Sequence, residues 1–149
     1  MRTFDDFTLG EELPLGNASF AQDEMIAFAQ RWDPQPFHVD PEAAAQTHYG
    51  EIIASGWQTL TSVSRLMTDL ILEQDWANLG GTGMDEVRLR APVRSGDVLS
   101  AKATVIAMEP SRSSQARGRI DFRVEFTYQR GERVGDYVVS LLLARRDDG

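Results

Sequence analysis

The spacing of apolar residues changes once along the chain, from a helical period in the first half to a strand period in the second. After Ser55, apolar side chains recur at steps of three and four as far as Glu73 or Trp76, which predicts a long amphipathic helix with Ser55 as its N-cap. From Met84 onward apolar and polar residues alternate, most regularly over residues 120–128, which predicts strands. We therefore expect an α+β fold in which an antiparallel β-sheet wraps one long central helix.

Shorter elements are predicted around this helix. Apolar residues at helical spacing after Asp23 predict a helix that ends near Asp33, and Asp40 followed by Pro41 is typical of an N-cap and first helical position. Pro34 and Pro36 predict a stiff, non-helical loop over residues 33–38. The glycine-rich residues 79–83 are expected to break the pattern before the strands begin. Further strands are predicted at residues 13–18, 87–91, 98–109 and 134–144.

Size and composition exclude several classes of protein. The chain has 149 residues, of which 42% are hydrophobic and 26% charged, as expected for a single globular domain over residues 1–149. No apolar run approaches the roughly 20 residues of a membrane span, and the acidic N-terminus lacks the apolar core of a secretory signal. Without cysteine and with only two histidines, a disulfide or thiolate nucleophile is excluded and few metal sites are possible. We expect a cytoplasmic protein that has no membrane partner.

The net charge of −8 argues against nucleic acid as a partner, because binding to phosphates needs a basic surface. The charge is uneven: residues 1–85 have a net charge of −11, whereas residues 86–119 have a net charge of +4. A local excess of arginine in an acidic protein suits a small phosphorylated ligand. Most of these arginines are expected on solvated strand faces, and Arg88, Arg90 and Arg94 are the candidates for a phosphate contact.

Asp33 and His38 place an acid and a base five residues apart on a segment stiffened by two prolines. Such a segment can hold a carboxylate and an imidazole at a fixed separation, which general acid–base catalysis requires. Either residue alone would be read as a structural loop residue, but together they favour catalysis. Gly56 follows the predicted N-cap, where unpaired backbone N–H groups and a partial positive charge can stabilise an oxyanion.

These residues lie in motifs that resemble a known family. Asp-Pro-Gln-Pro-Phe-His at 33–38, Ala-Ser-Gly at 54–56 and Pro-x-x-x-Gly-Asp at 92–97 resemble the MaoC-like dehydratases and (R)-specific enoyl-CoA hydratases over about residues 5–145. Gln35 stands where that family usually has Asn. The resemblance implies a single hot-dog fold and reversible hydration of a 2-enoyl thioester to a 3-hydroxyacyl thioester. It implies no metal or redox cofactor. Coenzyme A is expected as part of the substrate, and acyl carrier protein is the other possible carrier.

The resemblance also implies roles for individual residues. Asp33 and His38 would activate one water molecule, and the Gly56 N–H would bind the thioester carbonyl. Ser64, on the inner stripe of the long helix, is a second candidate for a contact with the catalytic loop, although a bond back to its own helix is the simpler reading. Trp57 is expected either to pack in the core against Phe37, which we favour, or to close the acyl pocket. Gln35 is counted among the substrate-binding residues, and a homodimer with the acyl tunnel near its interface is expected.

Two other functions remain open at this point. A hot-dog thioesterase would need a carboxylate near the start of the central helix, but the first acid in that helix is Asp69, about four turns from its start. A non-catalytic acyl-thioester-binding subunit of a dehydratase would have lost the acid–base pair, yet Asp33 and His38 are both present. The sequence therefore favours the hydratase over both alternatives.

Overall fold

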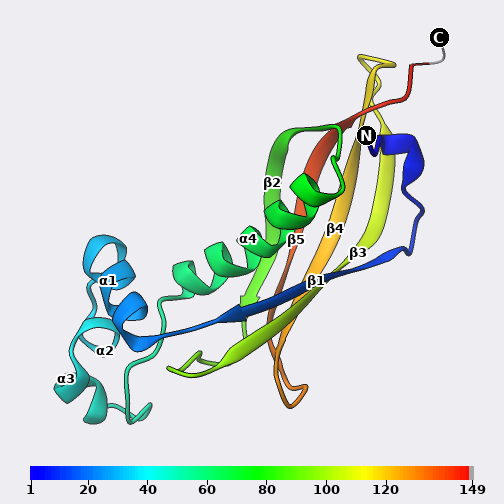
Figure 1. Ribbon diagram of the computed structural model, residues 1–149. Coiled ribbons are helices and arrows are strands. Elements are labelled where there is room, and N and C mark those ends of the chain that lie inside the picture. The colour runs from blue at the N-terminus through cyan, green and yellow to red at the C-terminus, as the bar shows by residue number, and fades with distance from the viewer. Residues whose placement is uncertain (148–149) are drawn as a thin grey trace.

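A computed structural model describes residues 1–147, and its main feature is a curved five-stranded antiparallel sheet that wraps around one long helix (Figure 1). The strand order across the sheet is β1-β3-β4-β5-β2, so β1 and β2 form its two edges. The predicted α+β class and hot-dog architecture are confirmed. The strands are β1 (Glu12–Ser19), β2 (Asn78–Leu89), β3 (Val98–Pro110), β4 (Arg117–Tyr128) and β5 (Arg133–Ala144).

The long helix α4 (Gly56–Glu73) begins and ends where the sequence pattern predicts. The Ser55 hydroxyl accepts a hydrogen bond from the Trp57 N–H at 3.3 Å, as expected of an N-cap. Along one face of α4, Leu60, Val63 and Met67 are buried against the inner face of the sheet. Among residues 1–147, no helix is both long enough and apolar enough to cross a membrane. The core is formed by this stripe and by buried side chains of the three central strands, including Leu99, Val105, Ile120, Phe122, Phe126 and Leu143.

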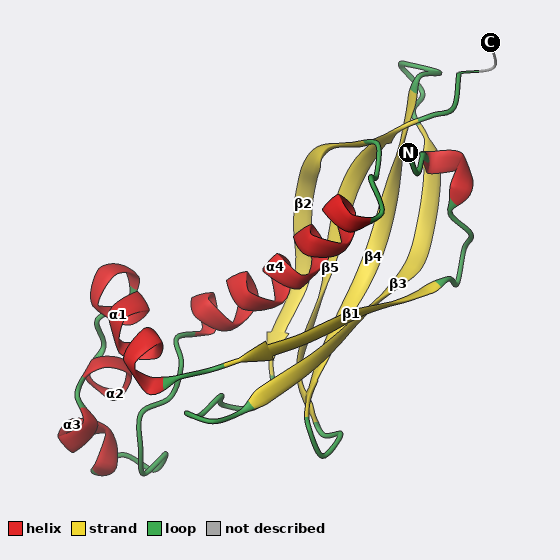
Figure 2. Ribbon diagram, in the orientation of Figure 1, coloured by secondary structure: helices red, strands yellow, loops and turns green. Residues whose placement is uncertain are grey.

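Three further helices gather beside the N-terminal end of α4, away from the centre of the sheet (Figure 2). They are α1 (Gln22–Trp32), α2 (Pro36–Val39) and α3 (Pro41–Ala45), and a 3₁₀ turn, η1 (Phe4–Asp6), lies near the N-terminus. The Asp40 side chain accepts hydrogen bonds from the Glu42 and Ala43 N–H groups, which confirms its predicted role as N-cap. The short helices and the loops that connect them lie beside the first turn of α4, and the candidate site lies between these segments.

Two predictions about local structure were wrong. Residues 33–38 are not a continuous loop, because Pro36 is the first residue of α2 and His38 lies within this helix. Proline is favoured at that position, where its missing N–H would have no helical partner anyway. The helical pattern does end before residues 79–83, but these residues already belong to β2 instead of preceding the strands, and the pairing of β2 with β5 shifts register around Gly80 and Gly83. An edge strand tolerates such bulges, and glycine allows them.

Candidate active site

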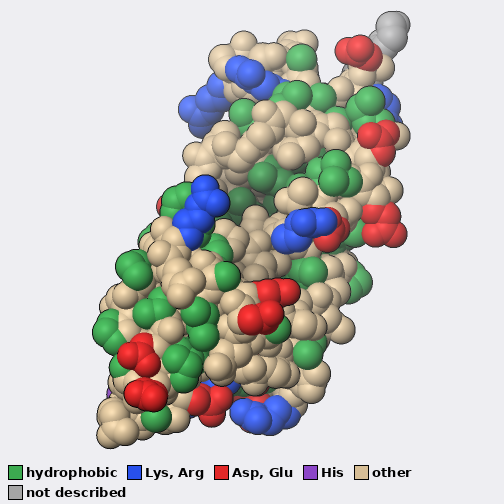
Figure 3. Space-filling model, turned by 60° about the vertical axis from the view of Figure 1, so that its left-hand side comes forward, with side chains coloured by type: hydrophobic (Ala, Val, Ile, Leu, Met, Phe, Trp, Pro, Cys, Tyr) green, Lys and Arg blue, Asp and Glu red, His purple; other side chains and the backbone are tan. Residues whose placement is uncertain are grey.

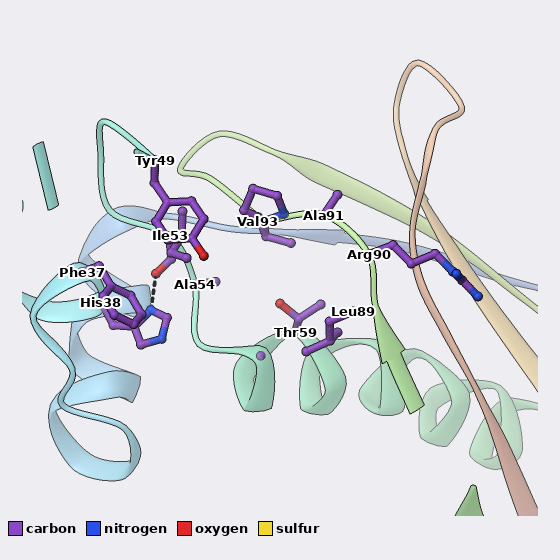
Figure 4. Close-up of a pocket in the computed structure, with 12 residues that line it drawn as sticks. Phe37, His38, Tyr49, Ile53, Ala54, Thr59, Leu89, Arg90, Ala91 and Val93 are labelled. Carbon is purple, nitrogen blue, oxygen red and sulfur yellow. Dashed lines mark hydrogen bonds between the residues drawn. The ribbon is translucent and has the colours of Figure 1, made fainter. Parts of the chain in front are cut away.

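A pocket of about 330 Å³ lies between α2, the loop before α4, the first turn of α4 and the segment that follows β2 (Figure 4). His38 lies at one end, Gly56 and Thr59 come from α4, and residues 89–93 form the opposite wall. A hydrogen bond connects residues 89–93 to the loop before α4: the Ala54 N–H donates to the Val93 carbonyl at 2.8 Å. Segments that are far apart in the sequence therefore enclose one cavity.

The backbone carbonyl of Ile53 orients the side chain of His38. The ring is 5% exposed, and its Nδ1 lies 2.8 Å from the Ile53 carbonyl oxygen. Because a carbonyl can only accept, Nδ1 carries the hydrogen and the Nε2 of the neutral imidazole keeps its lone pair. Nε2 lies 3.4 Å from Oδ2 of Asp33. The structure thus brings together the two residues that the sequence motif singled out.

Asp33 directly follows α1 and is surrounded by hydrogen-bond donors. Its Oδ2 accepts from the Ser55 hydroxyl at 2.7 Å, and its Oδ1 accepts from the Gln35 side-chain amide at 2.7 Å. The Ser55 hydrogen bond is the largest of the effects that lower the pKa of Asp33, helped by the Gln35 bond and the nearby His38 and opposed by burial. The carboxylate is therefore held ionised. Gln35 supports Asp33, and neither of these two residues is among those that line the pocket.

We predict that Ser55→Ala raises the pKa of Asp33 toward its ordinary value of 3.8, because the mutation removes the strongest stabilisation of the carboxylate. A lowered carboxyl pKa contributes stability that is complete above the ordinary pKa and is lost as the pH falls through the folded-state value. Acid unfolding of Ser55→Ala should therefore begin at higher pH than in the wild type. Loss of the helix cap should cost a further 0.5–2 kcal/mol or so at neutral pH.

Ser55→Thr is the matched control, because the threonine hydroxyl can still donate to Asp33 and accept from the Trp57 N–H. Thermal midpoints measured across acidic and neutral pH test the prediction. Parallel pH profiles for the alanine variant and the wild type would contradict it.

Gly56 is the first residue of α4, so its N–H has no acceptor within the helix. A Cβ built on Gly56 would lie 2.4 Å from Cδ1 of Leu89. Glycine therefore allows the helix start and the end of β2 to approach while the pocket between them stays open. Gly56 lines the pocket, and the role of its N–H as a donor to a thioester carbonyl stays a prediction.

Two polar side chains that line the pocket, Thr59 and Tyr49, were not singled out in the sequence. Thr59 shares a helical face with Gly56, three residues earlier, so the spacing alone could have identified it. Tyr49 comes from the loop after α3, where no periodicity gives a signal. Ser64 is partly buried and is not among the residues that line the pocket.

Trp57 does not pack in the core as predicted, because its side chain is 65% exposed. It continues the apolar stripe of α4, but the first turn lies at the end of the sheet, beside the short helices (Figure 1). Phe37 instead contacts His38, at 4.5 Å between ring centroids, and Tyr49, at 6.0 Å. Trp57 is also not among the residues that line the pocket.

The three candidate arginines have different partners in the fold. Arg90 lines the pocket, but its side chain turns toward β5 (Figure 4), where Nε lies 2.8 Å from Oδ2 of the buried Asp136. Arg94 donates to the Tyr49 carbonyl at 3.0 Å. Arg88 is exposed, and within residues 1–147 it pairs with no carboxylate. On the face shown in Figure 3, basic side chains lie in separate groups among acidic and hydrophobic ones.

Other ionisable groups have ordinary structural roles. Asp69 is exposed on α4 and bonded to Arg65 at 2.8 Å, far from the helix start that a thioesterase carboxylate would occupy. His48 is exposed in the turn after α3. In the part of the chain that the structure describes, no group of three or more His, Asp or Glu side chains could hold a metal ion.

Comparison with known proteins identifies relatives over most of the chain. Protein YdeM of Bacillus subtilis, itself uncharacterised, is 32% identical over 73% of this chain and 77% of its own length. The 3-hydroxyacyl-thioester dehydratase Z of Mycobacterium tuberculosis is 29% identical over 84% of this chain and 87% of its own length. The crystal structure of a MaoC-like dehydratase from Rhodospirillum rubrum superimposes with a TM-score of 0.87 at 32% identity, covering 98% of this chain and 99% of the other. The model of the MaoC-like domain matches residues 7–123. The chain therefore belongs to the MaoC-like dehydratase family.

Proposed function

We propose that the protein is a hydratase and dehydratase that interconverts a 2-enoyl thioester and a 3-hydroxyacyl thioester. The observation that carries the proposal is the distance of 3.4 Å between His38 Nε2 and Asp33 Oδ2, beside the pocket. We propose that both atoms act as hydrogen-bond acceptors in the reactive state. A neutral imidazole nitrogen and an ionised carboxylate oxygen cannot hydrogen-bond to each other. A water molecule can donate one hydrogen to each, which leaves a lone pair on its oxygen free to attack carbon.

In the hydration direction, the water oxygen bonds to C3 of the enoyl group while one water proton passes to His38 Nε2. The C2–C3 π electrons move toward C1, and the carbonyl oxygen becomes an enolate oxyanion that the Gly56 N–H stabilises. The proton then returns from Nε2 to C2, which regenerates the carbonyl and the neutral imidazole. Asp33, whose pKa is lowered, stays ionised and stabilises the transient imidazolium. Dehydration follows the same steps in reverse.

The relatives support the same class of substrate. The dehydratase Z of Mycobacterium tuberculosis is named for its action on 3-hydroxyacyl thioesters. We propose coenzyme A as the carrier, with acyl carrier protein as the alternative. We also propose a homodimer that forms through the exposed edge strand β2, on which Leu79, Met84 and Leu89 are exposed. Light scattering should then report about twice the chain mass of 16.6 kDa.

Incubation with crotonyl-CoA tests the function and separates it from the two alternatives. A hydratase removes the ultraviolet absorbance of the conjugated enoyl thioester without releasing thiol, whereas a thioesterase releases thiol. A non-catalytic binding subunit would do neither while still binding the ligand. Loss of absorbance without thiol release is the expected result, and either other outcome would overturn the proposal.

Of the three candidate arginines, Arg88 is expected to contribute most to binding the nucleotide phosphates. Arg90 and Arg94 already hold Asp136 and the Tyr49 carbonyl, whereas Arg88 is exposed near the pocket wall. Arg88→Gln should raise KM for an enoyl-CoA several-fold at low salt and leave kcat unchanged, because binding far from the reacting atoms is shared by the ground and transition states. An unchanged KM at low salt would contradict the assignment.

A further inference from the structure

We infer that Asp136 is a positioning residue, whose ion pair with Arg90 holds the pocket wall formed by residues 89–93 at a fixed distance from Gly56. Asp136 is not among the residues that line the pocket, so it would act on the reaction through Arg90. The inference rests on the proposed function, because the wall matters to catalysis only if the substrate carbonyl binds at the Gly56 N–H.

Asp136 is a charged side chain that the fold buries. It lies on β5 and is only 3% exposed. A buried carboxylate loses its hydration, so it needs a cation at close range. Nε of Arg90 lies 2.8 Å from Oδ2 of Asp136, and Nη1 of Arg123 lies 3.7 Å from its Oδ1. Because removing either partner of the closer pair leaves a buried charge poorly compensated, the pair fixes where Arg90 can lie.

These charges belong to a network of two acids and two arginines that spans an irregular part of β2. Arg123, on β4, also lies 3.0 Å from Glu86 on β2. The pairing of β2 with β5 shifts register between Asp85 and Arg88, and Glu86 has a φ of 52°. A non-glycine residue in this left-handed region is strained, so surrounding contacts must hold it there. The network therefore fixes the path of β2 just before the pocket wall.

The pocket wall begins at Leu89 and connects the network to the start of α4. The Arg90 N–H donates to the Val134 carbonyl at 2.7 Å, and the Arg90 side chain points away from the cavity toward β5 (Figure 4). Leu89 packs against Gly56, where a Cβ would lie 2.4 Å from Cδ1 of the leucine. A displacement of Arg90 therefore moves Leu89 relative to Gly56. A substrate carbonyl between them would then lose its proposed contact with the Gly56 N–H.

The far end of the pocket wall has anchors of its own. The Pro92 carbonyl accepts a hydrogen bond from the Tyr128 hydroxyl, and the Val93 carbonyl accepts one from the Ala54 N–H. Neither bond involves Asp136. Loss of the Asp136 charge should therefore loosen the end of the wall next to β2 and leave the far end attached.

The experiment compares crotonyl-CoA hydration by the wild type, Asp136→Asn and Arg90→Gln. Each variant should lower kcat by about tenfold with little change in KM, because a displaced wall weakens an interaction that forms in the transition state. The double variant should be no slower than either single variant, since both substitutions remove the same ion pair. Asp121→Asn is the matched control and should keep the wild-type kcat. It removes an ion pair with Arg119, at 3.1 Å, on the same face of the sheet but outside the pocket.

Hydrogen exchange of the backbone amides, followed by mass spectrometry, gives a readout that needs no turnover. In Asp136→Asn, exchange should become several-fold faster over residues 86–91 and stay unchanged in α4. This result together with a wild type that fails to hydrate crotonyl-CoA would overturn the proposed function but not the role of Asp136 in holding the wall. A wild-type kcat in Asp136→Asn, or additive losses in the double variant, would overturn the inference. An equal loss of kcat in Asp121→Asn would also overturn it, because any charge on this face would then have the same effect.

Discussion

Asp33→Asn and His38→Gln are each expected to lower kcat for crotonyl-CoA by about 10²–10⁴-fold, the range for loss of a positioned acid or base. Asn cannot stabilise a neighbouring imidazolium, and Gln cannot accept and return the proton. The double variant should be little slower than either single variant, because the two side chains act on the same water molecule.

Both substitutions should leave the fold intact. The amide oxygen of Asn can still accept from Ser55, and the amide nitrogen of Gln can still donate to the Ile53 carbonyl that now binds His38. Asp69→Asn is the matched control, because this exposed carboxylate lies on α4 outside the pocket and its substitution should leave kcat unchanged. Near-wild-type turnover in either catalytic variant, at an unchanged thermal midpoint, would end the assignment.

Gly135→Ala is expected to destabilise the protein by about 3 kcal/mol or more, at the upper end of the range for overpacking a core. A Cβ at this position would lie 2.5 Å from the Arg88 carbonyl oxygen and 2.5 Å from Cζ of the fully buried Phe126. Neither neighbour can move cheaply, since one is the backbone of β2 and the other a packed ring. The thermal midpoint should fall by on the order of 10 °C.

The same substitution should also impair the site. Leu89 pairs with Gly135 at the end of β2, and the chain then continues directly into residues 89–93, which line the pocket. Pushing β2 away from β5 displaces that wall from Gly56. Gly83→Ala, on the neighbouring strand β2, is the matched control, because a Cβ there meets no atom of the chain within 4 Å. Equal thermal midpoints for the two variants would contradict the packing argument.

Elements with strong local signals were predicted well from the sequence. The Ser55 cap and the apolar stripe from Leu60 to Met67 predict α4, and the alternation over residues 120–128 predicts β4. These signals are local because capping and amphipathic periodicity depend only on residues a few positions apart. The predictions were wrong where tertiary context decided, as at residues 79–83, which pair with β5 despite their glycines.

The sequence by itself singled out Asp33, His38 and Gly56 as candidate site residues, because their residue types and order are distinctive even without coordinates. Only the tertiary structure shows that the Ser55 hydroxyl, 22 residues away from Asp33, holds this carboxylate ionised, and that the Ile53 carbonyl fixes the tautomer of His38. The exposure of Trp57 and the different partners of the arginines could not be predicted from the sequence either. Both depend on where the sheet ends and on which segments meet there. The residue types indicated the chemistry that we propose, whereas contacts between distant segments decided the geometry and the size of the pocket, since such contacts form only when the whole core packs.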